Sequence, residues 1–213
     1  MIVRHIEILV EEPSMEAALR LIVPNLIGDA TFDIYTHQCK QDLLEKLSGR
    51  LRGYASWLPA DWRIMVIVDR DEEKCSQLKG RLEKGASDAG LKTRAMGQAR
   101  IQVVNRVAIE ELEAWFFGDW DAVRTAYPRI DVNIPNKQGY RGPDAIAGGT
   151  WEALERVLIR AGYFRMGLRK IEAARAIARH MDPQRNRSKS FQAFRDAIYE
   201  AVTTGPSARP AAQ

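Results

Sequence analysis

The stretch Ile64–Asp71 reads Ile-Met-Val-Ile-Val-Asp-Arg-Asp. Its first five residues are apolar and mostly β-branched, which favours a strand covered on both faces over a helix. The strand ends in Asp69 and Asp71, whose side chains lie on one side because side chains alternate along an extended backbone. Ligands of open α/β sheets bind beyond the carboxyl ends of the strands. The two carboxylates are therefore candidate oxygen ligands for Mg²⁺ or Mn²⁺.

Asp71 also has an alternative role as the cap of a following helix. In that interpretation Glu72 and Glu73 interact with the positive end of the helix dipole. Capping does not account for Asp69, so the metal site is the preferred interpretation and capping remains the alternative.

Composition indicates one substantial core, with a small helical annex, in a chain of 213 residues. The net charge of +4 mildly favours an anionic partner such as nucleic acid. Basic residues concentrate between Arg156 and Arg195, which fits either a phosphate-facing surface or a solvated helical face. Cys39 and Cys75 are too few for a disulfide framework or a zinc site. We find no long apolar segment and no signal peptide, so we expect a cytoplasmic protein.

Strand-like and helix-like segments alternate along the first part of the chain. The expected strands are Arg4–Glu11, Thr31–Thr36, Ile64–Asp71 and Ile101–Val107, and the expected helices that follow them are Pro13–Gly28, Leu43–Trp57, Glu72–Ala89 and Ala108–Phe117. This alternation predicts an α/β fold, with a mainly parallel sheet of about four strands and helices on both faces.

The rest of the chain has a different pattern. Residues Tyr127–Thr150 are rich in Gly, Pro, Asn and Asp and predict a long loop. Trp151–Ala161, Arg169–Met181 and Ser188–Val202 have the periodicity of amphipathic helices. We therefore expect an α/β domain over residues 1–127, a loop with a C-terminal helical extension packed on it over 128–203, and a flexible tail over 204–213.

Acidic residues follow three of the expected strands. Glu11 closes the first, Asp69 and Asp71 close the central one, and Glu111 and Glu113 follow the last. In a parallel sheet these ends meet at one edge, where the carboxylates would repel one another unless a cation lay among them. Taken singly, each cluster could be a helix cap or a solvated helix start.

Two of these segments resemble the motifs of the Toprim domain, the metal-binding catalytic fold of topoisomerases, primases and the overcoming-lysogenization-defect (OLD) nucleases. That pattern has a Glu closing the first strand, usually followed by Gly, and an Asp-x-Asp closing a later one. Leu9-Val10-Glu11-Glu12-Pro13 looks like the first motif and Val68-Asp69-Arg70-Asp71 like the second. Glu111-Leu112-Glu113-Ala114-Trp115 is similar to the acidic motif of the OLD-like branch.

The whole chain also resembles a family of small stand-alone Toprim-like prokaryotic proteins of unassigned function. A Glu-Ala-Trp segment, a late Lys and a final Ser-x-Ser-Phe segment recur in that family. Here they are Glu113–Trp115, Lys170 and Ser188–Phe191. Two positions depart from the Toprim pattern: Glu12 stands in place of Gly, and Met15 stands where OLD-like members often carry an acid. Glu12 removes a permissive residue from the turn and adds a charge.

The resemblance implies metal-assisted phosphodiester cleavage of nucleic acid, with DNA favoured over RNA, and a role in defence against phages or mobile elements. One or two Mg²⁺ or Mn²⁺ ions would bind Glu11, Asp69 and Asp71, with Glu111 or Glu113 holding a second ion or orienting water. Glu11 could instead be the general base, and Lys170 could stabilise the transition state. An ordinary exposed lysine is the alternative for Lys170.

Parts of the pattern also fit two other functions. A phosphatase of the haloacid dehalogenase type uses Asp-x-Asp after a strand but normally needs Thr or Val where this chain has Glu73. A stronger alternative is a non-catalytic Toprim-like subunit that works with a separate ABC-like ATPase. The chain has no Walker-type phosphate-binding segment, so any nucleotide hydrolysis would come from that partner. The sequence leaves open whether the protein forms a homo-oligomer.

Overall fold

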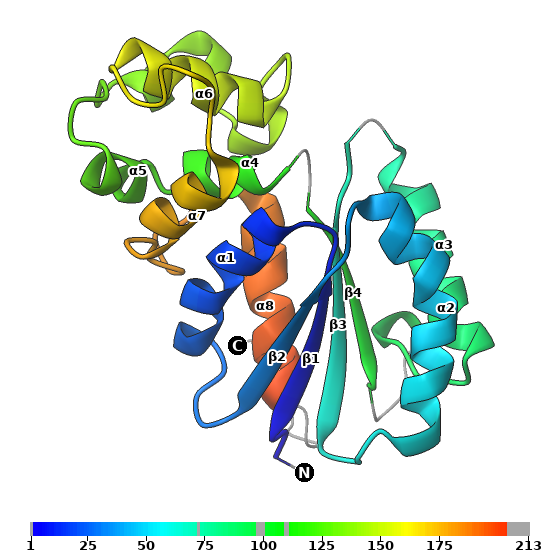
Figure 1. Cartoon of the computed structure of the whole chain (residues 1–213). Coiled ribbons are helices and arrows are strands. Elements are labelled where there is room, and N and C mark those ends of the chain that lie inside the picture. The colour runs from blue at the N-terminus through cyan, green and yellow to red at the C-terminus, as the bar shows by residue number, and fades with distance from the viewer. Residues whose placement is uncertain (1, 72, 97–100, 109–110, 204–213) are drawn as a thin grey trace, which may run out of the picture.

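The computed structural model describes residues 2–71, 73–96, 101–108 and 111–203. Its strands form one parallel sheet in the order β2-β1-β3-β4 (Figure 1). The strands are β1 (His5–Val10), β2 (Thr31–Thr36), β3 (Trp62–Asp69) and β4 (Val103–Ala108). The predicted α/β class with a parallel sheet of four strands is confirmed. Chain order reverses between β1 and β3, so the topological switch point lies at the centre of the sheet.

Helices cover both faces of the sheet, which explains the apolar run in β3. Met65 and Ile67 pack in one core cluster, on the face covered by α1 (Pro13–Ile22) and α8 (Lys189–Thr203). Alternate residues, Ile64, Val66 and Val68, pack in a second cluster under α2 (Lys40–Trp57) and α3 (Cys75–Asp88). A strand buried on both faces needs apolar side chains at every position.

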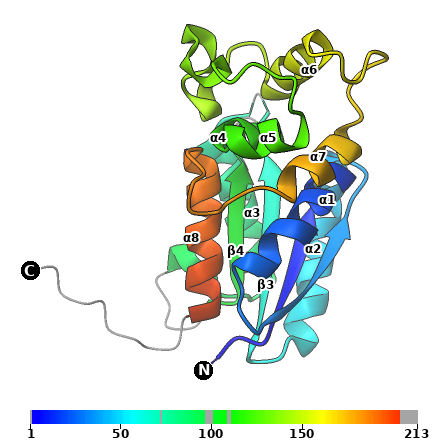
Figure 2. The same cartoon turned by 90° about the vertical axis from the view of Figure 1, so that its left-hand side faces the viewer.

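A helical cap stands beyond the carboxyl ends of the strands (Figures 1 and 2). It consists of α4 (Leu112–Gly118), α5 (Trp120–Ala126), α6 (Thr150–Arg160) and α7 (Lys170–Ala178). α7 packs on α1, and α8 then returns along β4 on the sheet face. Short 3₁₀ helices lie at Val23–Asn25, Arg94–Met96, Ile134–Asn136, Gln138–Tyr140 and Pro143–Ala145.

Several expected boundaries differ from the structure. α3 begins at Cys75, not Glu72, and its N-cap is Lys74. The last strand continues to Ala108, which pairs with Asp69, so the next helix starts only at Leu112. The predicted loop 127–150 is packed rather than loose, because its isoleucines are buried in the core. The predicted tail, 204–213, lies outside the described residues. Among the described helices, none has the length and apolar character needed to cross a membrane.

Candidate metal centre at the carboxyl edge of the sheet

The two central strands bring Glu11 and Asp69 together at the switch point. β1 and β3 are neighbours with Val10 opposite Ile67, so Glu11, which follows β1, and Asp69, which ends β3, leave the sheet side by side. Glu113 reaches the same place from the first turn of α4 in the cap. We call Glu11, Glu12, Asp69, Asp71 and Glu113 the acidic rim. The acids of β1 and β3 lie side by side because these strands are neighbours in the sheet. The spacing of residues in the sequence does not encode that strand order.

Three acids of the rim are buried, and no Lys, Arg or His side chain of the described residues donates a hydrogen bond to their carboxylates. The exposed fractions are 7% for Glu11, 4% for Asp69 and 2% for Glu113. Each has a buried oxygen that accepts no hydrogen bond from any described residue: Glu11 Oε2, Asp69 Oδ1 and Glu113 Oε2. An ionised carboxylate buried without partners is costly, so such a group either takes up a proton or pairs with a cation.

The pKa values show that these acids form one electrostatic cluster. Burial, followed by the charge of Asp71, raises the pKa of Glu11 to about 7. Burial also raises the pKa of Glu113 to about 7, against the opposing effect of Lys170. The pKa of Asp69 is raised well above its usual value by burial and then by Glu11, Glu12, Glu113 and Asp71. A metal ion among these side chains would replace the bound protons.

These shifts predict how metal binding depends on pH. In the folded protein Glu11 and Glu113 keep a proton up to about pH 7, whereas their ordinary pKa is 4.5. The folded state therefore binds more protons between these values, and the metal-free protein loses stability as the pH rises through that window. Mn²⁺ competes with those protons and favours the folded state. We expect MnCl₂ to raise the melting temperature more at about pH 8 than at about pH 5.5, measured against EDTA. An equal rise at both pH values would contradict a metal site built on these acids.

Lys170, predicted to lie at the site, is the first residue of α7 and faces the rim. Burial lowers its pKa, but Glu113, Glu12, Glu111 and Asp69 outweigh burial and raise it overall. Its ammonium nitrogen lies 5.0 Å from the centre of the Trp151 ring. The lysine is thus a fixed positive charge at the rim.

Lys40 is a second cation at the site, and sequence reasoning missed it. Its Nζ donates to the carbonyl oxygens of Asp69 and Arg70, both at 3.2 Å, and to the carboxylate of Asp71. It also pairs with Glu73 at 3.3 Å. Lys40 is the first residue of α2, where the helix dipole disfavours a positive charge. A lysine at this unfavourable position is the sequence feature that could have indicated its role.

Asp71 is not a helix cap. It lies four residues before α3, and its backbone is in the left-handed region, with φ of 49°. Lys40 holds its carboxylate, while its charge raises the pKa of Glu11. The capping alternative is therefore wrong, and Asp71 remains at the edge of the acidic rim.

The departure at Glu12 does not strain the turn. Its φ of −144° is extended backbone, which any residue adopts, so glycine is not required. Its side chain accepts a hydrogen bond from Ser14, and its charge contributes to the raised pKa values of Asp69 and Lys170. Glu12 thus adds a carboxylate to the rim without distorting Glu11.

Glu111 joins the last strand to the helical cap, and its predicted role in holding a second ion or orienting water stays a prediction. Its Oε2 accepts hydrogen bonds from Thr150 Oγ1 at 2.9 Å and from the Trp151 backbone at 3.0 Å. These donors lie in the first turn of α6, where backbone N–H groups have no acceptor within the helix. The Glu111 carboxylate provides that acceptor. Glu111 positions the cap, and Glu113 is the acid of this pair that is buried at the rim.

The rim acids do not form a tight three-ligand cluster. Within the described ranges, the one group with three ligand atoms all within 4.8 Å of one another is His5, Glu7 and Asp33, at the other end of β1. Mg²⁺ usually binds through one or two carboxylates and keeps several waters, so wider spacing is compatible with this ion. Glu72 and Glu110 lie outside the described residues.

The chain matches a protein family by its sequence. A family model described as "Domain of unknown function (DUF4276)" matches residues 10–199, a range that holds the whole acidic rim, Lys40 and Lys170. No curated protein and no solved structure matches the chain.

Proposed function

The chain belongs to the DUF4276 family, and we propose that it is a divalent-metal-dependent phosphodiesterase of the Toprim type that cleaves nucleic acid. The observation that carries the proposal is the set of unpartnered, buried carboxylate oxygens of Glu11, Asp69 and Glu113. They gather at the switch point beyond the carboxyl ends of the parallel strands, where such folds bind ligands.

The donor set suits Mg²⁺ or Mn²⁺, because the rim offers only hard carboxylate oxygens. Glu11, Asp69 and Glu113 would hold the ion, and Asp71, whose charge raises the pKa of Glu11, is the candidate for a further ligand. A bound ion would supply Lewis acidity and an activated water. Lys40 neutralises and fixes Asp71. Lys170, on the cap side of the rim, is placed to stabilise negative charge on a phosphodiester.

A basic groove beside the rim supports a nucleic-acid substrate. A hollow of about 780 Å³ runs along α7, and half of its lining residues are basic: Arg169, Lys170, Arg175 and Arg179 stand beside Glu172 and the apolar Leu168, Ile171 and Ala176. A second hollow of about 310 Å³ shares Arg175 and Arg179 and extends to Arg20 on α1. In the part of the chain that the structure describes, Arg175 and Arg179 make no hydrogen bond or ion pair, so both guanidinium groups are available to phosphates.

The basic residues near α8 are less available than the sequence suggested. Arg185 donates two hydrogen bonds to the buried carboxylate of Asp119, at 2.8 and 3.0 Å. Arg195 bonds the Pro183 carbonyl and Asp196. Part of the basic excess is therefore structural, and the groove residues are the better candidates for phosphate contacts.

The test of this function is a cleavage assay on the purified full chain. Supercoiled plasmid, single-stranded DNA and RNA should be incubated with Mg²⁺, with Mn²⁺ and with EDTA. We expect nicking that requires the ion and is stronger on DNA. Exchanging Arg175 and Arg179 together for Gln should weaken DNA binding and reduce its salt dependence, since fewer counterions are released. Exchanging Arg52 and Lys79 for Gln is the matched control, because these side chains lie on α2 and α3.

Two results would count against the proposal. Cleavage that persists in EDTA would indicate a contaminating or metal-independent enzyme. Metal binding at the rim without cleavage of any of these substrates would favour the alternative function, a Toprim-like subunit that works with a separate ATPase.

A further inference from the structure

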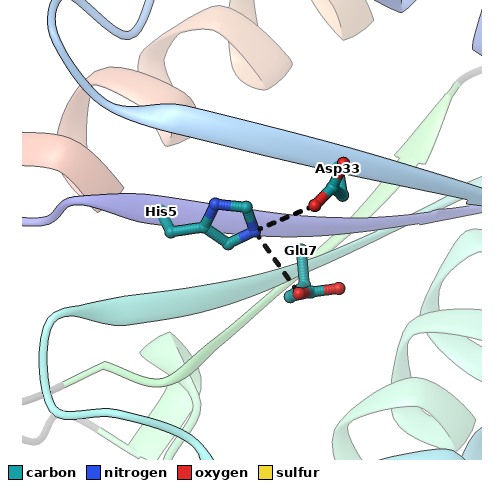
Figure 3. Close-up of side chains that lie close together, drawn as sticks. All are labelled: His5, Glu7 and Asp33. Atoms are coloured by element: carbon teal, nitrogen blue, oxygen red, sulfur yellow. Dashed lines mark ion pairs between the residues drawn. The ribbon is translucent and has the colours of Figure 1, made fainter.

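We propose that His5, Glu7 and Asp33 form a second metal site, which binds one Zn²⁺ ion and ties the edge strand β2 to β1 (Figure 3). We call these residues the amino-end cluster. It lies at the start of β1, six residues before Glu11, which corresponds to about 20 Å along a strand. The site is therefore separate from the acidic rim and independent of the proposed nuclease function.

Strand pairing builds the cluster. His5 and Glu7 are two residues apart on β1, so their side chains lie on the same face of the sheet. In the parallel register Glu7 lies opposite Asp33 of β2, and His5 lies opposite Thr31. His5 Nε2 is 3.3 Å from Glu7 Oε1 and 3.8 Å from Asp33 Oδ2 (Figure 3).

The contacts of His5 leave its Nε2 beside the two carboxylates. Thr31 Oγ1 lies 2.7 Å from His5 Nδ1 and 3.2 Å from the Arg4 carbonyl oxygen. When the hydroxyl donates to that carbonyl it accepts the Nδ1 proton, and Nε2 of the neutral ring is then the unprotonated nitrogen that can bind a metal. A partner on the other ring nitrogen is what orients metal-binding histidines.

Nε2 lacks the hydrogen bond that a simple ion pair would provide. His5 is only 6% exposed, and its Nε2 makes no hydrogen bond with any described residue. A protonated ring would place a buried N–H near two carboxylates without donating to either. A neutral ring would point a lone pair at two negative groups. A cation larger than a proton resolves both conflicts.

Glu7 and Asp33 have the surroundings that metal ligands need. Glu7 is 3% exposed, and its Oε2 accepts a hydrogen bond from Tyr54 at 2.8 Å. This leaves Oε1 for the ion. The Asp33 side chain is 62% exposed, so it provides access from solvent and leaves room for a water ligand. Arg50 lies on the α2 side, with its guanidinium carbon 4.4 Å from the centre of the Tyr35 ring.

The spacing and donor types favour zinc. With bonds of about 2.0–2.2 Å, neighbouring ligands of a tetrahedral Zn²⁺ site lie roughly 3.3–3.6 Å apart. The distances of 3.3 and 3.8 Å around Nε2 are close to that range. Imidazole also suits Zn²⁺ better than Mg²⁺, whereas the all-carboxylate rim has the opposite preference.

The experiment is zinc titration by calorimetry on the full chain, with ZnCl₂ as the probe and thermal unfolding in parallel. We expect Asp33→Ala and His5→Gln each to weaken one binding event by at least about 10-fold and to reduce the thermal stabilisation by Zn²⁺. Asp69→Asn, at the rim, should leave that event unchanged. The control Asp29→Ala removes the same charge from an exposed position before β2.

Asp33 is the safer variant, because its exposed side chain can be removed with little risk to folding. Equal melting temperatures of Asp33→Ala and the wild type in EDTA would establish this. Zinc affinity unchanged by Asp33→Ala, or no zinc binding in the wild type, would overturn the site and leave an ion pair with a protonated His5. Four-coordinate Co²⁺ absorption that disappears in Asp33→Ala would support it independently.

Discussion

Asp69→Asn is expected to reduce metal-dependent cleavage by about 10³-fold or more while leaving the metal-free protein at least as stable as the wild type at about pH 8. Asp69 is buried, and Glu11, Glu12, Glu113 and Asp71 all raise its pKa. Asparagine keeps the shape of the protonated acid and removes one negative charge from the rim. It also offers N–H donors to the acids that remain. A functional group that is held at a cost to stability commonly behaves in this way.

The measurements are the initial rate of plasmid nicking with Mn²⁺ and the melting temperature in EDTA. Asp88→Asn is the matched control, because Asp88 is exposed and pairs with Lys84 on the same helix. The control should leave both quantities near their wild-type values. Cleavage retained in Asp69→Asn would show that Asp69 is not a ligand. A marked loss of stability in EDTA would show instead that its carboxylate supports the fold.

Asp144→Ala is expected to lower the free energy of unfolding by about 3 kcal/mol. Asp144 Oδ1 accepts hydrogen bonds from the hydroxyls of Ser188 and Ser190, at 2.7 and 2.8 Å. Its Oδ2 accepts from the backbone of Lys189, the first residue of α8, at 2.6 Å. The variant would leave two buried hydroxyls and a helix end without their acceptor. For a chain of this size the melting temperature should fall by roughly 6–12 °C.

Asp131→Ala provides the control for Asp144. It lies in the same long connection, but its carboxylate is exposed and pairs with Lys137. Urea unfolding of both variants should show a clear fall in the midpoint for Asp144→Ala and a small one for Asp131→Ala. A change below about 0.5 kcal/mol in Asp144→Ala would mean that water replaces its contacts at no cost.

The Asp144 network also explains the Ser-Lys-Ser-Phe segment, which the sequence could only match to a family pattern. Ser190 accepts a hydrogen bond from the Trp115 indole at 2.9 Å, and Asn186 donates to the Trp115 carbonyl at 2.8 Å. Trp115 lies two residues after Glu113 on α4. The segment therefore joins the start of α8 to the helix that carries a rim acid. Its role in the described structure is to position that helix.

The sequence by itself determined the class of fold and most of the acids of the site. Apolar, β-branched runs and helical periodicity are local properties, and they sufficed to predict the four strands and their succession with helices. The rule that ligands bind at the carboxyl ends of parallel strands then pointed to five acids, Glu11, Asp69, Asp71, Glu111 and Glu113. Helix starts were less well predicted, because pairing of Ala108 with Asp69 extended the last strand.

The tertiary structure alone decided which side chains meet. Lys40 holds the turn after β3 from a helix about 30 residues earlier, and Glu111 accepts hydrogen bonds from the first turn of α6. His5 meets Asp33 only because β2 pairs with β1 in one register. Contacts of this kind depend on strand order and on the packing of distant segments. Residue spacing in the sequence encodes neither the strand order nor this packing. The contacts between charged side chains therefore follow only from the tertiary structure.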